Sequence, residues 1–205
     1  VEMLQDIAMT SDKINAYISA DSNLAGYPQL TLYKNHQPTK IFFKGIPSGH
    51  EFTSLILAIL NTDLQGKLPD EMIQQKIKSL KGPIHLKTYI SLSCENCPDV
   101  IQALNLMSVI HPDFTHEMID GAYVQEEIKK LGIQGVPTIM ANDKMLHSGK
   151  ITLIDLLTKL ENHFGSEKTS QQNTETDLGT YDVAVIGGGP AGASAAIYSA
   201  RKGLK

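Results

Sequence analysis

The sequence predicts an α/β protein made of two related units, followed by a linker and the beginning of a further domain. Three observations support this fold class. Apolar runs typical of buried strands alternate with amphipathic helical runs, one strand pattern occurs twice, and a polar stretch separates a glycine-rich turn from everything before it. A chain of 205 residues is long enough for one or two domains and part of a third.

The internal repeat defines the first unit. Residues 26–32 resemble residues 135–140, and in both places a second short strand, a Ser-Gly pair and an amphipathic helix follow. We assign residues 1–64 to a first unit that contains no cysteine and that we expect to be cut at its N-terminus. Residues 65–81 connect the two units, with a helix expected over 69–80.

The second unit covers residues 82–164 and shows the order β-α-β-α-β-β-α. Crossover helices make parallel neighbours and a tight turn makes an antiparallel pair, so this order predicts a mixed sheet flanked by helices. The expected strands are 83–90, 114–119, 137–141 and 144–147, and the expected helices are 95–110, 122–131 and 151–163.

The composition of the chain excludes several classes of function. Hydrophobic residues make up 41% of the chain, as in soluble globular proteins, and the net charge of −4 with interspersed signs predicts no nucleic-acid partner. The longest fully apolar run, residues 55–60, is too short to span a bilayer, and no signal peptide is visible. The chain does not begin with Met, so we expect its true start to be missing. Two cysteines without a wider disulfide framework indicate a reducing cytoplasm.

The most informative motif is Cys94-Glu95-Asn96-Cys97, which contains the only two cysteines of the chain. It stands between a strand-like run and a helix, where unpaired N–H groups and the positive end of the helix dipole favour a thiolate. A CxxC in this position is typical of a thioredoxin-like fold. The alternative is half of a zinc site, but no second cysteine pair or closely spaced histidine pair exists, so we expect no metal.

The order of the two thiols predicts their roles. Cys94 lies outermost at the helix start and is the expected nucleophile, whereas Cys97 lies one turn further in and is the expected resolving thiol. Glu95 between them adds negative charge, which predicts a reducing couple and not a strong oxidant.

Two further residues are candidates for the site. Val136-Pro137 stands at the head of a later strand, where thioredoxin-like folds place a cis proline beside the dithiol. A cis turn there would leave the Val136 backbone free to pair with a substrate strand. Pro137 would also exclude metal from the two thiols. Proline is the residue for which cis is cheap, and the alternative is an ordinary strand-entry proline. Glu51 opens the last helix of the first unit, and on sequence alone its charge simply complements the helix dipole.

The sequence also predicts which of several histidines and helical apolar residues are exposed and which are buried. These histidines show no ligand spacing and are expected at the surface: His85, His111, His116 and His163. Three residues of the helix after the dithiol are expected in the core: Leu104, Leu106 and Met107.

The C-terminal part begins with a polar stretch, residues 165–180, which cannot build a core and is expected to be a flexible linker. Residues 181–205 then predict the first βα unit of a Rossmann-like domain. The turn between the expected strand 181–186 and the helix consists of Gly187, Gly188, Gly189, Pro190, Ala191 and Gly192. GxGxxG in this context is typical of a dinucleotide pyrophosphate site, the alternative being a merely close-packed βα turn. This piece alone is not expected to bind FAD well.

Taken together, the chain resembles the flavoprotein component of alkyl hydroperoxide reductase along nearly its whole length. The most specific stretches are residues 49–55, 89–100, 102–109, 187–193 and 196–203. The resemblance implies two tandem thioredoxin-like folds, only the second with a dithiol, joined by a linker to an FAD domain. It also implies a glutamate of the first fold near the dithiol, which matches Glu51 and would let that carboxylate exchange a proton.

The resemblance further implies a relay in the full-length protein, whose body is similar to thioredoxin reductase. NADH reduces FAD, FAD reduces a second dithiol, that dithiol reduces Cys94–Cys97, and this pair reduces the peroxiredoxin component of alkyl hydroperoxide reductase. Homodimerisation would use regions outside this chain, which also lacks the nicotinamide domain and the second dithiol. Two alternatives stay open: a general glutaredoxin- or thioredoxin-like reductase, and a non-catalytic module in which the first unit docks the peroxiredoxin.

Overall fold

The computed structural model describes residues 2–19, 26–167 and 179–204. The chain divides into two compact bodies, Val1–Glu167 and Lys168–Lys205, and each is described by itself. Among the described residues, no helix combines the length and the apolar character that crossing a membrane requires.

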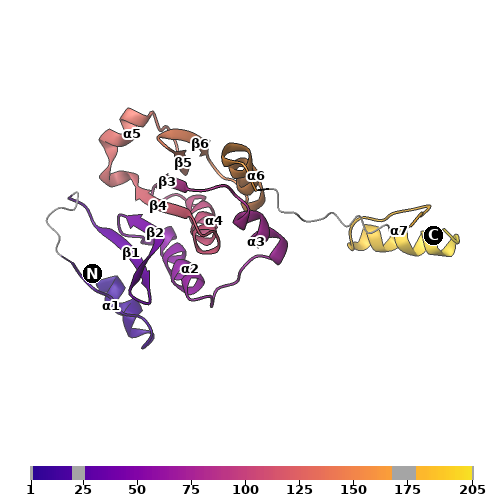
Figure 1. Cartoon of the computed structure of the whole chain (residues 1–205), viewed down its shortest axis with the longest axis horizontal. Helices are drawn as coiled ribbons and strands as arrows, with labels where there is room; N and C mark the ends of the chain where they lie inside the picture. Colours follow the sequence, from indigo (N-terminus) through magenta and orange to yellow (C-terminus); the bar gives the residue numbers. More distant parts are fainter. Residues whose placement is uncertain (1, 20–25, 168–178, 205) are drawn as a thin grey trace. The chain divides into compact units, whose positions relative to one another are not determined.

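The N-terminal body is built on a six-stranded sheet in the order β1-β2-β4-β3-β5-β6 (Figure 1). The strands are β1 Gln29–Lys34, β2 Gln37–Lys44, β3 Ile84–Ile90, β4 Phe114–Asp120, β5 Thr138–Ala141 and β6 Lys144–Ser148. β4 pairs in parallel with both β2 and β3, whereas β1–β2, β3–β5 and β5–β6 are antiparallel. The predicted mixed α/β architecture is therefore confirmed.

The helices follow the predicted order. They are α1 Glu2–Met9, α2 Phe52–Thr62, α3 Glu71–Lys78, α4 Cys97–Ile110, α5 Gln125–Leu131 and α6 Leu153–Phe164, with 3₁₀ turns η1 Gly49–Glu51 and η2 Gly121–Tyr123. The single helix expected over 122–131 is thus divided into η2 and α5. The division follows from Asp120, whose side chain accepts a hydrogen bond from the Ala122 N–H at 3.0 Å and caps η2 separately.

The two repeat copies share one sheet. Residues 41–44 of β2, from the first copy, pair in parallel with residues 116–119 of β4, from the second. The helix α2 of the first copy also packs against α4 of the second, because Leu55 and Ala58 belong to the same apolar cluster as Ile101. Elements of both copies are consequently held in a fixed relation beside the start of α4.

Two apolar clusters form the core between the sheet and helices α1, α2, α3, α4 and α6, and a third, around Tyr89 and Met140, packs against α5. One lies under α3, α4 and α6 and includes Leu86, Leu104 and Phe114. The other lies under α1, α2 and the first turns of α4 and includes Phe43 and Met118. Leu104 and Met107 are fully buried as expected, but Leu106 is only half-buried, because it lies beside the stripe of α4 that faces the sheet.

Two histidines that were expected at the surface are buried, and that expectation was wrong. His116 is fully buried between Thr88 Oγ1, 2.9 Å from its Nε2, and Asn105 Oδ1, 2.7 Å from its Nδ1. Burial lowers the pKa of His116 to about 3, so the ring is neutral. His111 accepts the Asp113 N–H at Nδ1 and donates from Nε2 to the Leu80 carbonyl. Neighbouring elements supply these partners, so no local sequence pattern shows them.

The His116 bridge leads to a stability prediction. Thr88→Val removes the hydroxyl that pairs with the buried imidazole, so the free energy of unfolding should fall by about 2 kcal/mol. Urea denaturation followed by circular dichroism measures this. Thr115→Val, at a half-buried β4 position with the same change of side chain, should alter it by less than about 0.5 kcal/mol. Equal losses in both variants would contradict a specific role for the bridge.

Residues 165–167, which the sequence assigned to the linker, belong to the N-terminal body. The Lys81 N–H donates to the Gly165 carbonyl at 3.0 Å and the Glu167 N–H donates to the Ser79 carbonyl at 2.7 Å, so residues 165–167 pair with residues 79–81. The polar composition of the stretch carries no signal for these main-chain hydrogen bonds. Of the expected linker, residues 168–178 lie outside the described residues.

The C-terminal body contains the predicted helix but not the predicted strand. Helix α7, Pro190–Arg201, begins directly after the glycine-rich turn. Residues 181–186 form no strand, and Ile186 is fully exposed. A strand needs a hydrogen-bonded neighbour, and the described residues of this body contain none.

Candidate functional site

The CxxC motif lies at the carboxyl edge of the parallel strands. Ile90 at the end of β3 pairs with Asp120 at the end of β4, and Lys44 at the end of β2 pairs with Ile119, so the three strands end level. The chain then turns through residues 91–96, where the Cys94 N–H donates to the Ser91 carbonyl at 2.9 Å. Helix α4 starts at Cys97, with Pro98 in its first turn. The predicted position of the dithiol at a helix start is confirmed.

Cys94 and Cys97 form a disulfide with their Cα atoms 5.5 Å apart. Cys97 is fully buried in the cluster that includes Leu55, Ile90 and Ile101, whereas Cys94 is only half-buried. An incoming group therefore reaches the Cys94 sulfur first. This difference in accessibility supports the order of roles expected from the sequence.

The Val136–Pro137 peptide bond is cis, as expected. It stands immediately before β5, which pairs with β3 beside the dithiol loop through Thr138 and Tyr89. The Cys94 sulfur lies 3.8 Å from the Val136 carbonyl oxygen, so a reduced thiol at Cys94 has an acceptor within reach. The structure thus brings three predicted site residues together: Cys94, Cys97 and Pro137.

Glu51, whose charge was expected to complement the helix dipole, is buried. Its exposed fraction is 0%, and neither carboxylate oxygen has a hydrogen-bond partner among the described residues. Burial raises the pKa of Glu51 to about 7, although the nearby Ser54 hydroxyl lowers it in part. A buried carboxyl with a pKa near neutrality is typical of functional sites.

The turn that carries Glu51 packs against the dithiol region. η1 contacts α4, and a Cβ atom at Gly49 would lie 3.2 Å from the Leu92 carbonyl oxygen in the dithiol loop. Gly49 has a φ of +57°, which glycine adopts readily. Glu51 is held in this turn, and Gln102 of α4 donates to Ser54 of α2 at 3.4 Å one turn further along. Sequence reasoning did not select Gly49 or Ser54 as site residues, and the Ser-Gly pair of the repeat was the available signal.

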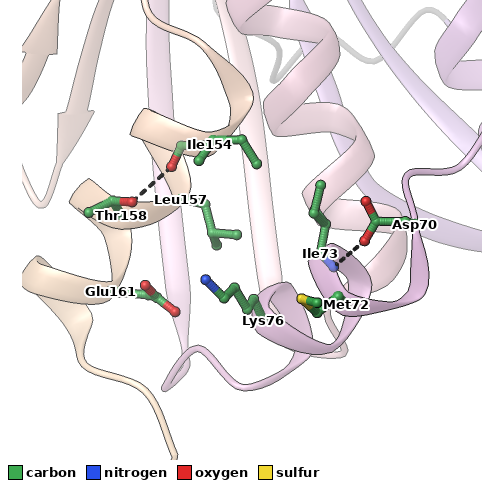
Figure 2. Close-up of a pocket in the computed structure, with 8 residues that line it drawn as sticks. All are labelled: Asp70, Met72, Ile73, Lys76, Ile154, Leu157, Thr158 and Glu161. Atoms are coloured by element: carbon green, nitrogen blue, oxygen red, sulfur yellow. Dashed lines mark hydrogen bonds between the residues drawn. The ribbon is translucent and has the colours of Figure 1, made fainter. Parts of the chain in front are cut away.

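Two cavities of the N-terminal body lie away from the dithiol. Figure 2 shows one of about 260 Å³ between α3 and α6, with Ile73 and Lys76 on one side and Leu157 and Glu161 on the other. Another, of about 450 Å³, lies between α1 and α2 and is lined by both apolar and acidic side chains, among them Phe52 and Asp6. Neither is lined by Cys94 or Cys97. No cluster of three or more metal-ligating side chains occurs among the described residues.

The glycine-rich turn fits part of a dinucleotide site. Gly187 has a φ of +110°, and a Cβ at Gly192 would collide with the Gly187 carbonyl, so both positions require glycine for this turn. A Cβ at Gly188 or Gly189 would meet nothing within 4 Å, which leaves the N-terminus of α7 open to a phosphate. The described residues supply this turn and no other wall of a flavin site.

Comparison with known proteins agrees with this geometry. The Thioredoxin domain family matches residues 84–162. The chain is 44% identical over 204 residues to the AhpF component of alkyl hydroperoxide reductase of Staphylococcus epidermidis, covering 100% of this chain and 38% of that protein. It is 41% identical over 205 residues to a protein of Ferdinandcohnia aciditolerans named NADH dehydrogenase, again covering 38% of the relative. The chain therefore spans well under half the length of these relatives.

A solved structure has the same fold. The N-terminal domain of alkylhydroperoxide reductase AhpF from Enterococcus faecalis superposes with a TM-score of 0.72 and 27% identity, covering 78% of this chain and 81% of that one. The sequence match runs through the dithiol, the linker region and the glycine-rich turn together. The chain belongs to the AhpF family of alkyl hydroperoxide reductase components and corresponds to its N-terminal part.

Proposed function

We propose that this chain is the dithiol–disulfide electron-transfer module of an NADH-dependent, FAD-containing peroxiredoxin reductase. The observation that carries the proposal is the Cys94–Cys97 disulfide, with one sulfur accessible and the other buried, at the start of α4. The module takes two electrons from the flavoprotein body of the same protein and passes them to the peroxiredoxin component of alkyl hydroperoxide reductase for peroxide removal.

The transfer to the partner proceeds by two exchange steps. The Cys94 thiolate attacks one sulfur of the partner disulfide; that S–S bond breaks, the other partner sulfur leaves as a thiolate, and a mixed disulfide forms. The Cys97 thiolate then attacks the Cys94 sulfur, which releases the second partner sulfur and closes Cys94–Cys97. Two electrons move to the partner, which is reduced, and the module is oxidised.

Glu51 is proposed to handle the proton of the buried thiol. Cys97 has to lose its proton before it can attack, and its surroundings are apolar. A carboxyl with a pKa near 7, held on the turn that packs against α4, is suited to accept that proton and to return it when the disulfide is reduced again. Pro137 is proposed to shape the loop that faces Cys94, where the Val136 backbone meets the partner segment.

The cofactors belong to the complete protein. In it, bound NADH and FAD would supply the two electrons that the thiols receive. The residues of this chain that would hold the FAD pyrophosphate lie in the glycine-rich turn at the N-terminus of α7. They are Gly187, Gly188, Gly189, Pro190, Ala191 and Gly192. We further propose a cytoplasmic location and a homodimer formed outside these residues.

A trapping experiment tests the proposal. Cys97→Ser leaves the attacking sulfur but removes the resolving one, so the reduced variant mixed with the oxidised peroxiredoxin should accumulate a covalent adduct. Non-reducing gel electrophoresis and mass spectrometry measure the adduct, and dithiothreitol should dissolve it. The matched control, Cys94→Ser, should give no adduct at the active site. If the wild-type chain fails to reduce the peroxiredoxin while it reduces generic disulfides well, the general reductase is the better assignment.

A further inference from the structure

We infer that Thr138 is a positioning residue of the dithiol site. Its hydroxyl holds the Val136 carbonyl against the Cys94 sulfur, and in the reduced chain this carbonyl accepts the thiol hydrogen and restrains the formation of the thiolate. We call the hydrogen bonds that hold Val136 in place the loop latch, and they are made by Thr138, Ser148 and Gly149. The inference rests on the proposed function, in which Cys94 is the attacking group.

The Thr138 hydroxyl is the centre of the loop latch. Thr138 is the first residue of β5 and is fully buried. Its Oγ1 donates to the Gly135 carbonyl at 2.6 Å, so this hydrogen bond spans Val136 and Pro137. A hydroxyl has one hydrogen, so in the 2.9 Å contact between the two side-chain oxygens Ser148 donates and Thr138 accepts. The loop before β5 is thereby held to the edge strand β6.

The main chain holds the same loop at a second point. The Gly149 N–H, directly after β6, donates to the Pro137 carbonyl at 2.8 Å. Gly149 has a φ of +94°, a conformation that glycine adopts readily and that turns the chain back toward the loop. On the other side of β5, Thr138 pairs with Tyr89 of β3. The strands on both sides of β5 therefore fix where the loop lies.

The loop latch fixes the group that faces the nucleophile. The Val136 carbonyl oxygen lies 3.8 Å from the Cys94 sulfur, where a thiol can donate to it. A carbonyl oxygen accepts from the neutral thiol and repels the thiolate, so it makes the thiol harder to ionise. The start of α4 has the opposite effect, because its free N–H groups favour the thiolate. The reactivity of Cys94 is therefore set by two opposed groups, one of which the loop latch holds.

The Ser-Gly pair of the internal repeat gains a role in this arrangement. In the second copy the pair supplies Ser148 and Gly149, which both bond to the loop or to its first following residue. In the first copy Gly49 approaches the Leu92 carbonyl of the dithiol loop instead. Both pairs therefore lie next to the dithiol region, but the second pair holds the loop whose carbonyl contacts the sulfur.

The experiment follows alkylation of Cys94 by iodoacetamide from pH 5 to 10, in a reduced chain that carries Cys97→Ser and so has one thiol. Thr138→Val removes the hydroxyl from a side chain of nearly the same shape, so the carbonyl is no longer held at the thiol. Alkylation at pH 7 should become about threefold faster, as expected for the loss of one modest hydrogen bond. Near pH 10, where the thiol is ionised in every variant, the rates should agree within about twofold.

Three further variants identify the hydroxyl as the cause. Thr138→Ser keeps the hydroxyl and should retain the reference profile. Ser148→Ala removes only the bond from β6 and should give a smaller acceleration at pH 7. Thr158→Val makes the same change of side chain at an exposed α6 hydroxyl that donates to the Ile154 carbonyl, and it should leave the profile unchanged.

The charged and titratable groups around the dithiol are the same in all of these variants, so each of them acts equally on every profile. They are Glu95 in the dithiol loop, His50 and Glu51 on η1, and Asp99 of α4 with its ion-pair partner Lys150. A difference between two profiles therefore reports the loop latch and not a change in nearby charge.

Three results would overturn the inference: an unchanged Thr138→Val profile, an equal acceleration in Thr138→Ser, and an acceleration that persists at pH 10, which would report easier access to the sulfur. If Thr138→Val does not give the reference circular dichroism spectrum, Ser148→Ala, on the edge strand, decides by the same comparison. The proposed function fails separately, when the wild-type chain does not reduce the oxidised peroxiredoxin, and the alkylation profiles do not depend on that result.

Discussion

Replacing Cys94 by serine should lower the rate of electron transfer to the peroxiredoxin by at least about a thousandfold, because a neutral hydroxyl does not attack a disulfide at neutral pH. Cys97 remains in this variant, but it is fully buried and cannot reach a partner sulfur. Stopped-flow measurement with the oxidised peroxiredoxin checks the rate. Circular dichroism should show an unchanged fold, since a half-buried sulfur is replaced by a smaller oxygen.

The comparison with a second substitution sharpens this result. Cys97→Ser should keep the first exchange step and lose only the release step, so it forms the adduct that Cys94→Ser cannot form. Substantial transfer by Cys94→Ser would show that the accessible sulfur is not the nucleophile, and the roles of the two cysteines would have to be exchanged.

Glu51→Gln should remove a large pH dependence of stability. The Glu51 pKa is about 7 in the folded chain against 4.5 for an ordinary glutamate, so the folded state keeps a proton that the unfolded state has released. The free energy of unfolding therefore decreases as the pH rises from about 4.5, and the loss is complete above about pH 7.5, where it amounts to about 3 kcal/mol. The glutamine variant carries no charge and should not show this decrease.

The test compares the free energy of unfolding of wild type with that of the Glu51→Gln variant. Urea denaturation of wild type and Glu51→Gln at pH 4 to 8, both with the disulfide intact, should give curves that separate by about 3 kcal/mol as the pH rises. Asp155→Asn is a matched control, because it neutralises an exposed carboxylate at a helix start. Parallel curves for wild type and Glu51→Gln would mean that the buried carboxyl titrates normally.

The same variant separates stability from catalysis. If Glu51 accepts the Cys97 proton, the release step of the Glu51→Gln variant should be slower and lose its dependence on pH near 7, although its folded state is more stable at pH 8 than that of wild type. A slower step in a more stable protein cannot be attributed to a damaged fold.

The order of elements could be predicted from the sequence because it depends on local signals. Hydrophobic period, the Ser-Gly pairs and the CxxC at a helix start are all visible within short windows. The cis Val136–Pro137 bond was also correctly expected, but from its position relative to Cys94 and not from proline alone.

The parts that could not be predicted depend on contacts between distant residues. His116 is 28 positions from Thr88 and 11 from Asn105, and only the fold brings these polar groups together. The burial of Glu51 has the same origin, since the sequence shows a charge at a helix start but not the elements that pack around it. The strand expected over 181–186 was a different error, because its pattern requires a neighbouring strand that the described residues lack.

The pairing of residues 165–167 with residues 79–81 fixes the place in the fold where the N-terminal body ends. Residues 79–81 precede β3 and the dithiol follows it, and the seven residues of β3 separate the two places by about 20 Å. Glu167, at the end of the N-terminal body, therefore lies at the end of β3 opposite to the one from which the chain enters the dithiol loop.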